Sequence, residues 1–254
     1  HLLSAVGSDF YGDMLLEQTR QAGVNTQNCI RLHGQNTSTY LSIANSQDET
    51  VLAINDTHLL DALTPQLLNA SRELLTHAGV ILVDCNLTPQ ALEWVFTLAG
   101  NIPVFVDTVS EFKAEKVKSW LGRIHTLKPT RRELEILWGN AINNDEQLRC
   151  AVNDLHAQGV QRIVVCLEDE SVFCSEKEGE AFALTPPAHP VVDSFGADDA
   201  LMAGLLYSFL DGSEFRDGAQ FAIACAALAR ASISINNPTL SVDNAWYLLK
   251  NSAQ

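Results

Sequence analysis

Short runs of β-branched and aliphatic residues alternate along this chain with longer amphipathic segments. From residue 80 to residue 166 the runs and segments follow one another regularly, as 80–83, 88–99, 104–106, 111–121, 124–127, 131–138 and 163–166. The runs fit buried strands, and the apolar spacing of the longer segments fits helices. This alternation predicts βαβ units and therefore an α/β fold with a mainly parallel sheet.

Residues 30–54 interrupt the alternation. Polar and apolar residues alternate through 37–43 and again through 51–53, on either side of the polar segment 45–49. The pattern predicts a β-hairpin with no helix between its strands. Both an ordinary edge hairpin and a projecting lid fit it. The lid is favoured because an isolated hairpin is only marginally stable and needs a partner surface.

Two further patterns concern an alanine-rich segment and the ends of the predicted strands. Residues 219–231 are rich in alanine and predict a helix that is buried nearly all round, which core packing alone would explain. Ligands of parallel sheets bind beyond the carboxyl ends of the strands, where this sequence has Asp84, Asp107, Lys128 and Glu168. The two aspartates could equally be turn formers that cap the next helix.

The net charge and the hydrophobic content of the chain exclude some classes of function. The 254 residues are 46% hydrophobic and carry a formal charge of −15, so a sizeable core is expected, while a nucleic acid or anionic membrane partner is not. No apolar run approaches the ~20 residues of a membrane span, and no signal-peptide pattern stands at the start. We expect a soluble cytoplasmic protein. Six scattered cysteines are expected to be reduced, buried hydrophobic residues.

Residues 193–199 read Asp-Ser-Phe-Gly-Ala-Asp-Asp and lead directly into the apolar segment 200–206. Small residues at Gly196 and Ala197 let backbone N–H groups point at a ligand, and a helix that begins there adds the positive end of its dipole. Asp199 stands where it could accept a proton from a substrate hydroxyl. The segment fits a site for a transferring phosphoryl group. It fits equally an ordinary acidic helix N-terminus.

Two more segments of the chain carry recognisable motifs. Residues 5–12 read Ala-Val-Gly-Ser-Asp-Phe-Tyr-Gly, and residues 127–135 read Leu-Lys-Pro-Thr-Arg-Arg-Glu-Leu-Glu. With residues 193–199 they resemble the signature segments of the ribokinase (pfkB) family of carbohydrate and nucleoside kinases. Within that family the chain is most similar to the pseudouridine kinase branch, through residues 36–42, 51–56, 107–110 and 236–238.

The resemblance implies a ribokinase-like, three-layer α/β/α fold with a mainly parallel central sheet. It implies a single domain over residues 1–254, with a small β lid inserted at residues 30–54. The implied activity is ATP-dependent phosphoryl transfer to a hydroxymethyl group of a sugar or nucleoside, with a pseudouridine-like compound as the first candidate and Mg²⁺ as the metal. In the family such a lid closes over the sugar and often pairs with a second subunit, so a homodimer is possible.

The expected roles of individual residues also come from this resemblance. Asp199 corresponds to the catalytic base, and the anion hole corresponds to Gly196, Ala197 and Asp198. The ATP-binding positions are Lys128, Glu168, Ser171 and Asn237, with Asn236 also near the base. Glu133 corresponds to the acid that organises Mg²⁺ through water, although a first-turn helix acid would look the same. Asn36 and Thr37 are the expected substrate contacts.

Four positions depart from the family pattern. Asp198 stands where most members have glycine, and Thr130 replaces an asparagine, which predicts a weakened metal site. Glu168 and Ser171 occupy the two glycine positions of a bend that lies against the ATP phosphates. Three consecutive acids, residues 168–170, would then face the polyphosphate. Two unit charges ~4 Å apart repel by about 4 kcal/mol at an effective dielectric of 20, so either extra cations compensate or ATP binds poorly.

The beginning of the sequence also differs from the family. Members have a strand, a helix and a Gly-Gly sugar-binding motif upstream of the segment that matches residues 1–12. A single βαβ unit needs roughly 30 or more residues. We therefore expect a chain that lacks the N-terminal strand and helix of its family.

A second class of function stays open beside the kinase. It is a catalytically weakened homologue that binds a small molecule or a partner protein as a sensor. An α/β hydrolase or a dehydrogenase is disfavoured, because the sequence has no Gly-x-Ser-x-Gly and no early Gly-x-Gly-x-x-Gly.

Overall fold

The computed structural model describes residues 1–45, 50–234 and 236–252. The chain divides into two compact units, residues 1–104 and residues 105–254. Apart from its first residue, the polar segment expected to form the hairpin turn at 45–49 lies outside the described residues.

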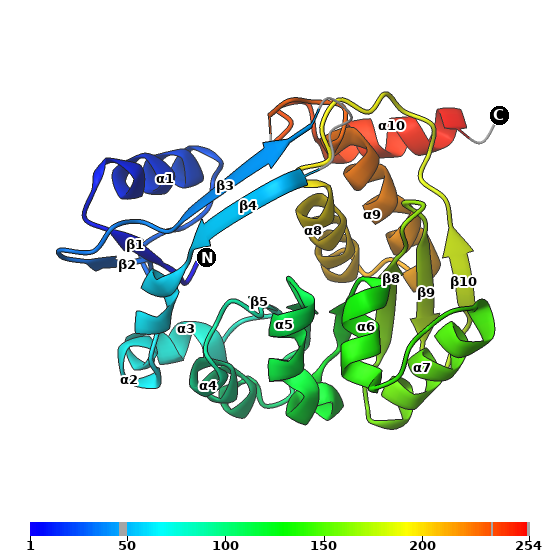
Figure 1. Ribbon diagram of the computed structural model, residues 1–254, viewed down its shortest axis with the longest axis horizontal. Helices are drawn as coiled ribbons and strands as arrows, with labels where there is room; N and C mark the ends of the chain where they lie inside the picture. Colours follow the sequence, from blue (N-terminus) through cyan, green and yellow to red (C-terminus); the bar gives the residue numbers. More distant parts are fainter. Residues whose placement is uncertain (46–49, 235, 253–254) are drawn as a thin grey trace. The chain divides into compact units, whose positions relative to one another are not determined.

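The first unit begins with a strand, a helix and a second strand (Figure 1). β1 (Ala5–Gly7) pairs in parallel with β2 (Ile30–Leu32), and α1 (Phe10–Gln21) connects them. β3 (Thr39–Ala44) then pairs antiparallel with β4 (Thr50–Asp56). The hairpin is thus shorter than the segment 30–54, because residues 30–32 belong with β1 and a turn with a left-handed Gly34 (φ 73°) follows them.

Short helices and one βα element complete this unit. They are η1 (His58–Ala62), α2 (Pro65–Leu68), η2 (Asn69–Ser71), α3 (Arg72–Thr76), β5 (Ile81–Asp84) and α4 (Pro89–Ala99). Ala5, Leu59, Leu63, Leu68 and Ala91 form a buried apolar cluster. Thr88 caps α4 by accepting a hydrogen bond from the Ala91 N–H, and Pro89 occupies its first turn, as expected of a helix start.

The second unit contains a sheet in which three parallel strands continue into an antiparallel edge. β6 (Val104–Asp107), β7 (Thr126–Lys128) and β8 (Arg162–Cys166) are parallel neighbours. β9 (Val172–Glu176) pairs antiparallel with β8, and β10 (Ala181–Leu184) pairs antiparallel with β9. The carboxyl ends of the three parallel strands therefore meet at one edge of the sheet.

The connecting helices largely match the predicted segments. They are α5 (Glu111–Ala114), η3 (Glu115–Arg123), α6 (Arg131–Trp138) and α7 (Asp145–Ala157). The segment 111–121 was expected to be one helix, and most of it is wound as the tighter 3₁₀ form instead.

Three helices follow the sheet strands, and two of them pack unusually closely. These are α8 (Ala197–Leu210), α9 (Phe215–Ala229) and α10 (Val242–Ser252). A Cβ atom at Gly204 of α8 would lie 2.5 Å from Cα of Ala222 in α9, so only glycine allows this approach. Ala222 and Ala224 are fully buried, which explains the alanine-rich segment as a helix packed on several sides.

Candidate active site

Polar groups gather where β6, β7 and β8 end. Asp107 is in register with Lys128, whose Nζ lies 3.0 Å from Asp107 Oδ2 and 3.9 Å from Asp198 Oδ1. Burial alone would lower the pKa of Lys128, but the surrounding negative groups raise it above the ordinary lysine value. Burial also raises the pKa of the neighbouring Cys166 thiol to about 12, so the two aspartates provide the negative charge at neutral pH. Lys128 is therefore a buried ammonium close to the start of α8.

The turn before α8 leaves backbone donors open. The Asp193 carboxylate accepts a hydrogen bond from the Phe195 N–H at 2.9 Å, and Gly196 follows in the left-handed region with φ 81°. Among the described residues, the N–H groups of Gly196, Ala197 and Asp198 find one acceptor, Ser194 O, which lies 3.4 Å from the Ala197 nitrogen. The first N–H groups of any helix lack intrahelical acceptors, so this turn can donate to an anion.

A cavity of about 530 Å³ opens at this turn, entirely within the second unit. Its walls come from the start of α6, the β8–β9 turn, the start of α8 and one face of α9. The lining residues are Thr130, Arg131, Arg132, Cys166, Leu167, Glu168, Glu170, Ser171, Val172, Pro186, Ser194, Ala197, Asp198, Leu201, Ile223, Ala226, Ala227 and Arg230. One side is polar and carries three arginines, whereas the side formed by α8 and α9 is mostly apolar.

The acids of the β8–β9 turn are paired with cations. Glu168 Oε2 lies 3.3 Å from Arg131 Nε. Both terminal nitrogens of Arg230 donate to the Glu170 carboxylate, and this pairing holds the Glu170 pKa below its usual value. Of the two outcomes that the sequence left open for these acids, the structure has the compensating cations.

Asp169 and Ser171 hold the β8–β9 turn by bonding to each other. Asp169 Oδ1 accepts hydrogen bonds from the Ser171 hydroxyl at 2.5 Å and from the Ser171 N–H at 3.1 Å, and these bonds lower the pKa of Asp169. Glu170 between them has a left-handed φ of 68°. The bend expected at 168–171 thus forms without glycine, because a side-chain hydrogen bond holds it.

Glu133 is buried within a hydrogen-bond network. Its Oε2 accepts from the Thr108 hydroxyl at 2.7 Å and from the Thr130 N–H at 2.8 Å, while Thr130 Oγ1 accepts from the Glu133 N–H at 3.3 Å. The last two bonds form a capping box at the start of α6. Within the described part of the chain, no three His, Cys, Asp or Glu side chains come together to hold a metal. The role of Glu133 toward Mg²⁺ stays a prediction.

Asn237, expected near the base, is engaged within the chain. Its Nδ2 donates to Leu228 O at 2.6 Å, and its Oδ1 accepts from the N–H and the hydroxyl of Thr239, both at 2.9 Å. It is not one of the residues that line the 530 Å³ cavity. Its amide fixes the loop after α9, and direct contact of Asn237 with a nucleotide stays a prediction.

In the first unit, the segment 5–12 and the expected substrate residue Thr37 form one closed network. Thr37 Oγ1 donates to Asp9 Oδ1 at 2.5 Å and accepts from the Gly7 N–H at 3.0 Å. Asp9 also accepts from the N–H groups of Gly12 and Thr37, both at 2.8 Å, and it caps α1. The neighbouring Asn36 is exposed. These bonds hold Gly7, Asp9 and Gly12 together at the start of α1.

Asp84, one of the two strand-end aspartates, has the turn-forming role that the sequence left open. Its carboxylate accepts from the Asn86 N–H and from Asn86 Nδ2, both at 2.9 Å. Asp107 combines both roles, because its Oδ1 accepts from the Val109 N–H at 3.0 Å while its Oδ2 faces Lys128. The prediction that all six cysteines are buried is wrong for Cys150, which is exposed on α7, and holds only in part for Cys29 and Cys166, which are half-buried.

The sequence reasoning missed Arg131 and Arg230. Arg131 belongs to the segment 127–135 and directly follows the capping residue Thr130. This position at the start of a helix could have indicated that Arg131 lines the same cavity as Thr130. Arg230 carried no local signal, because its partner Glu170 is 60 residues away in the sequence.

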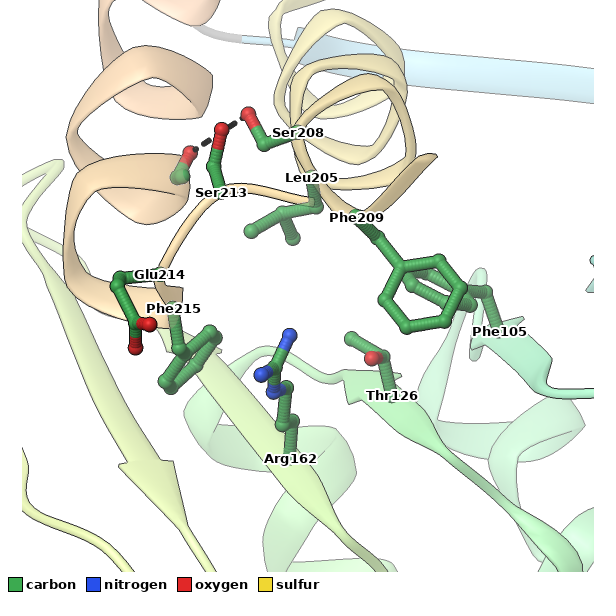
Figure 2. Close-up of a pocket in the computed structure, with 10 residues that line it drawn as sticks. Phe105, Thr126, Arg162, Leu205, Ser208, Phe209, Ser213, Glu214 and Phe215 are labelled. Carbon is green, nitrogen blue, oxygen red and sulfur yellow. Dashed lines mark hydrogen bonds between the residues drawn. The ribbon is translucent and has the colours of Figure 1, made fainter. Parts of the chain in front are cut away.

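A second, much smaller cavity lies at the opposite ends of the same strands (Figure 2). Phe105, Thr126 and Arg162 come from the starts of β6, β7 and β8, and its volume of about 10 Å³ allows at most one water molecule. The Arg162 guanidinium stacks 4.8 Å from the centre of the Phe215 ring, and its Nε lies 2.7 Å from Glu176 Oε1. Its charge is matched inside the fold, so this cavity is part of the packing.

Within the described part of the chain, no helix combines the length and the apolar character needed to span a bilayer.

A turn with open N–H donors, a buried lysine and a large cavity on an α/β sheet are the features expected of a phosphotransferase, and comparisons identify the family. Residues 1–241 match the model of the pfkB family of carbohydrate kinases, and the chain belongs to that family. It is 71% identical over 249 residues to the uncharacterized sugar kinase YeiI of Escherichia coli K12, with 98% of this chain and 69% of YeiI covered. It is 41% identical over 251 residues to the pseudouridine kinase of the same strain, with 99% and 80% covered.

A solved structure gives the same fold. Arabidopsis thaliana ribokinase, complexed with ribose and ATP, superposes with a TM-score of 0.86 at 21% identity, covering 98% of this chain and 81% of that one. The predicted ribokinase-like α/β fold and the resemblance to the pseudouridine kinase branch are confirmed. The chain is an enzyme of the sugar and nucleoside kinase family.

Proposed function

We propose that this protein transfers the γ-phosphoryl group of ATP to a hydroxymethyl group of a nucleoside or sugar. The observation that carries this proposal is the open turn before α8. Among the described residues, its three N–H groups at Gly196, Ala197 and Asp198 have one acceptor at the long distance of 3.4 Å, and two of these residues line the large cavity. Donors fixed in this way stabilise the negative charge on a phosphoryl group in transit.

Asp199 is the proposed catalytic base. Successive helix residues project about 100° apart, so Asp199 leaves α8 in a different direction from Asp198, which lines the cavity. Asp199 is not among the lining residues, and its side chain is exposed. In-line transfer requires the acceptor hydroxyl to lie on the far side of the phosphorus atom from the leaving ADP. A base beside the nucleotide cavity, and not within it, meets that requirement.

The proposed step balances as a direct displacement. Asp199 takes the proton of the hydroxymethyl group, and the hydroxyl oxygen forms a bond to the γ-phosphorus atom. The bond from that phosphorus to the β–γ bridging oxygen breaks, and ADP leaves with its electron pair. Lys128 adds a fixed positive charge near the turn, since its ammonium is 3.9 Å from Asp198 and is kept charged by its acidic neighbours.

The rest of the cavity suits the nucleotide. Leu201, Ile223, Ala226 and Ala227 provide apolar walls for a base, while the α8 turn provides donors for phosphates. A volume of about 530 Å³ falls within the usual range for sites of small organic ligands. The apolar wall and the polar wall therefore divide the cavity as ATP would require.

Mg²⁺ is proposed to accompany ATP. It is usually bound through one or two carboxylates together with substrate phosphates, so a ready-made cage of three acids is unnecessary. Asp198 is the carboxylate available at the cavity, since its side chain is 70% exposed, and Glu133 is the acid expected to act through water. Bound Mg²⁺ would neutralise charge on the phosphates during transfer.

The proposed acceptor is a pseudouridine-like nucleoside, by analogy with the relative that shares 41% identity. Asn36 and Thr37 are the proposed contacts to it, and residues 30–54 are proposed as the lid of a single kinase domain. Because Thr37 already bonds to Asp9 and Gly7, the exposed Asn36 is better placed to offer new hydrogen bonds.

Asp199→Asn tests the proposed chemistry. An amide cannot accept the hydroxyl proton, so kcat for transfer from MgATP to pseudouridine or related nucleosides should fall by about 10² to 10⁴. Asp211→Asn, at the other end of α8, is the matched control and should keep normal turnover. Equal rates for Asp199→Asn and the wild type would remove Asp199 from the mechanism. Absence of transfer to every compound in a sugar and nucleoside panel would contradict the proposed activity.

The hairpin is proposed to pair two copies of the chain. The register places Leu41 opposite Ile54 and Ile43 opposite Leu52, which gives one face of the hairpin four adjacent aliphatic side chains. These four side chains are 48–58% exposed. Sedimentation should give a dimer that Leu41→Ser with Ile54→Ser converts to a monomer, and a monomeric wild type would contradict the pairing.

A further inference from the structure

Arg131 has hydrogen-bonding capacity that its surroundings in the described chain do not use. It is the first residue of α6 and lines the 530 Å³ cavity, with 27% of its side chain exposed. Its Nε atom is buried and has no hydrogen-bond partner among the described residues. Glu168 lies 3.3 Å from that nitrogen, close enough for an ion pair but without the alignment of a hydrogen bond.

The two other arginines of the cavity differ from Arg131. Arg230 is 12% exposed, and both of its terminal nitrogens are taken by the Glu170 carboxylate. Arg132 is 75% exposed and lies 3.7 Å from Glu111, which is not a cavity residue. Arg131 is thus the cavity arginine that combines burial with an unsatisfied donor.

A guanidinium donor without an acceptor is unfavourable. The Nε atom itself is closed to solvent, so a ligand would reach Arg131 through the exposed part of its side chain at the cavity. Guanidinium groups bind phosphate through a planar pair of N–H donors, and they do so with little loss of side-chain freedom. We propose that Arg131 binds the phosphates of the nucleotide. Arg131 is then a further phosphate-binding residue of the site described above. This inference rests on the proposed ATP-dependent function.

Glu168 has a defined part in this arrangement. In the absence of nucleotide it holds the Arg131 guanidinium at the cavity wall by charge, and its poor alignment leaves donors available for phosphate oxygens. Arg131 in turn offsets the acid that would otherwise repel the polyphosphate. The pair therefore keeps the cavity able to accept ATP although an acid lines it.

The test compares ligands with and without phosphate. Calorimetry should show that Arg131→Ala weakens MgATP binding by roughly tenfold to a hundredfold, since a charge-assisted hydrogen bond is lost, and leaves the affinity for adenosine unchanged. Arg131→Lys keeps the charge but loses the planar fork, and should recover only part of the affinity. Arg20→Ala removes an exposed arginine that pairs with Glu17 on α1 and does not line the cavity, so it is the control and should bind MgATP within about twofold of the wild type.

The affinities for MgATP and adenosine distinguish a failure of the Arg131 role from a failure of the proposed function. Normal MgATP binding by Arg131→Ala, with normal binding by the wild type, overturns the role of Arg131 and leaves the proposed function standing. An equal loss of ATP and adenosine affinity means that the substitution deforms the cavity, and it also overturns the role. A wild type that binds adenosine but not MgATP contradicts the proposed function itself.

Discussion

Two short motifs of this chain look alike in sequence and differ in structure. Both the segment 5–12 and the segment 193–199 combine glycine with aspartate directly before a helix. In the first, Asp9 is saturated by the N–H groups of Gly12 and Thr37 and by the Thr37 hydroxyl. In the second, the N–H groups of Gly196, Ala197 and Asp198 have a single long bond among the described residues, from Ala197 to Ser194 O.

The difference indicates a structural role for the segment 5–12 and a ligand-binding role for the segment 193–199. A turn whose donors and acceptors bond to one another holds the backbone in place and has little left to offer a ligand. A turn whose donors stay open beside a cavity is held by its neighbours and is ready to bind an anion. At 193–199 the Asp193 carboxylate holds Phe195, and further support comes from outside the segment, since the Arg230 carbonyl accepts from the N–H groups of Val192 and Asp193.

The largest expected effect that would test this contrast is on the stability of the closed motif. A Cβ atom at Gly7 would lie 2.4 Å from Gln35 O and 2.5 Å from the Thr37 nitrogen, so Gly7→Ala should lower the free energy of unfolding by about 3 kcal/mol. Gly79→Ala is the control, because no atom lies within 4 Å of its added Cβ. Urea unfolding followed by circular dichroism measures both. Equal midpoints for Gly7→Ala and the wild type would contradict the packing argument.

A smaller effect is expected from the charge of the closed motif. Hydrogen bonds from the Thr37 side chain and backbone, followed by that from Gly12, hold the pKa of Asp9 below 3.8. The folded state therefore prefers the ionised carboxylate, and the stability that this adds is present above about pH 4 and lost as the pH falls through the folded pKa. Asp9→Asn should lower the melting temperature at pH 7 and flatten its decline below pH 4. A decline as steep as that of the wild type would exclude Asp9 as its source.

The smallest expected effect belongs to the open motif and its acidic neighbours. Glu168→Gln removes a negative charge from the cavity wall and frees Arg131, so MgATP should bind severalfold more tightly. Glu178→Gln, on the β9–β10 turn outside the cavity, controls for the change in net charge. An unchanged ATP dissociation constant for Glu168→Gln would mean that Glu168 does not influence the phosphates.

Much of the fold could be predicted from hydrophobic spacing. The helix at 131–138 matches α6, and the runs at 104–106 and 163–166 fall within β6 and β8. Local spacing determines such elements because burial on one face requires a fixed period. The charge balance of the β8–β9 turn could not be predicted from the sequence. Its three acids alone would repel the phosphates of ATP, and the sequence does not show which cations pair with them. Those partners, Arg131 and Arg230, come from distant parts of the chain.

The sequence alone determined the family resemblance and most of the alternation of strands and helices over residues 80–166, because these depend on residues that are close together along the chain. Only the tertiary structure decided which acids are neutralised, that Thr37 bonds to Asp9, and that Arg131 keeps a buried donor free of hydrogen bonds among the described residues. Charges and hydrogen bonds act over a few ångströms in space, and the spacing of residues in the sequence does not reveal those distances.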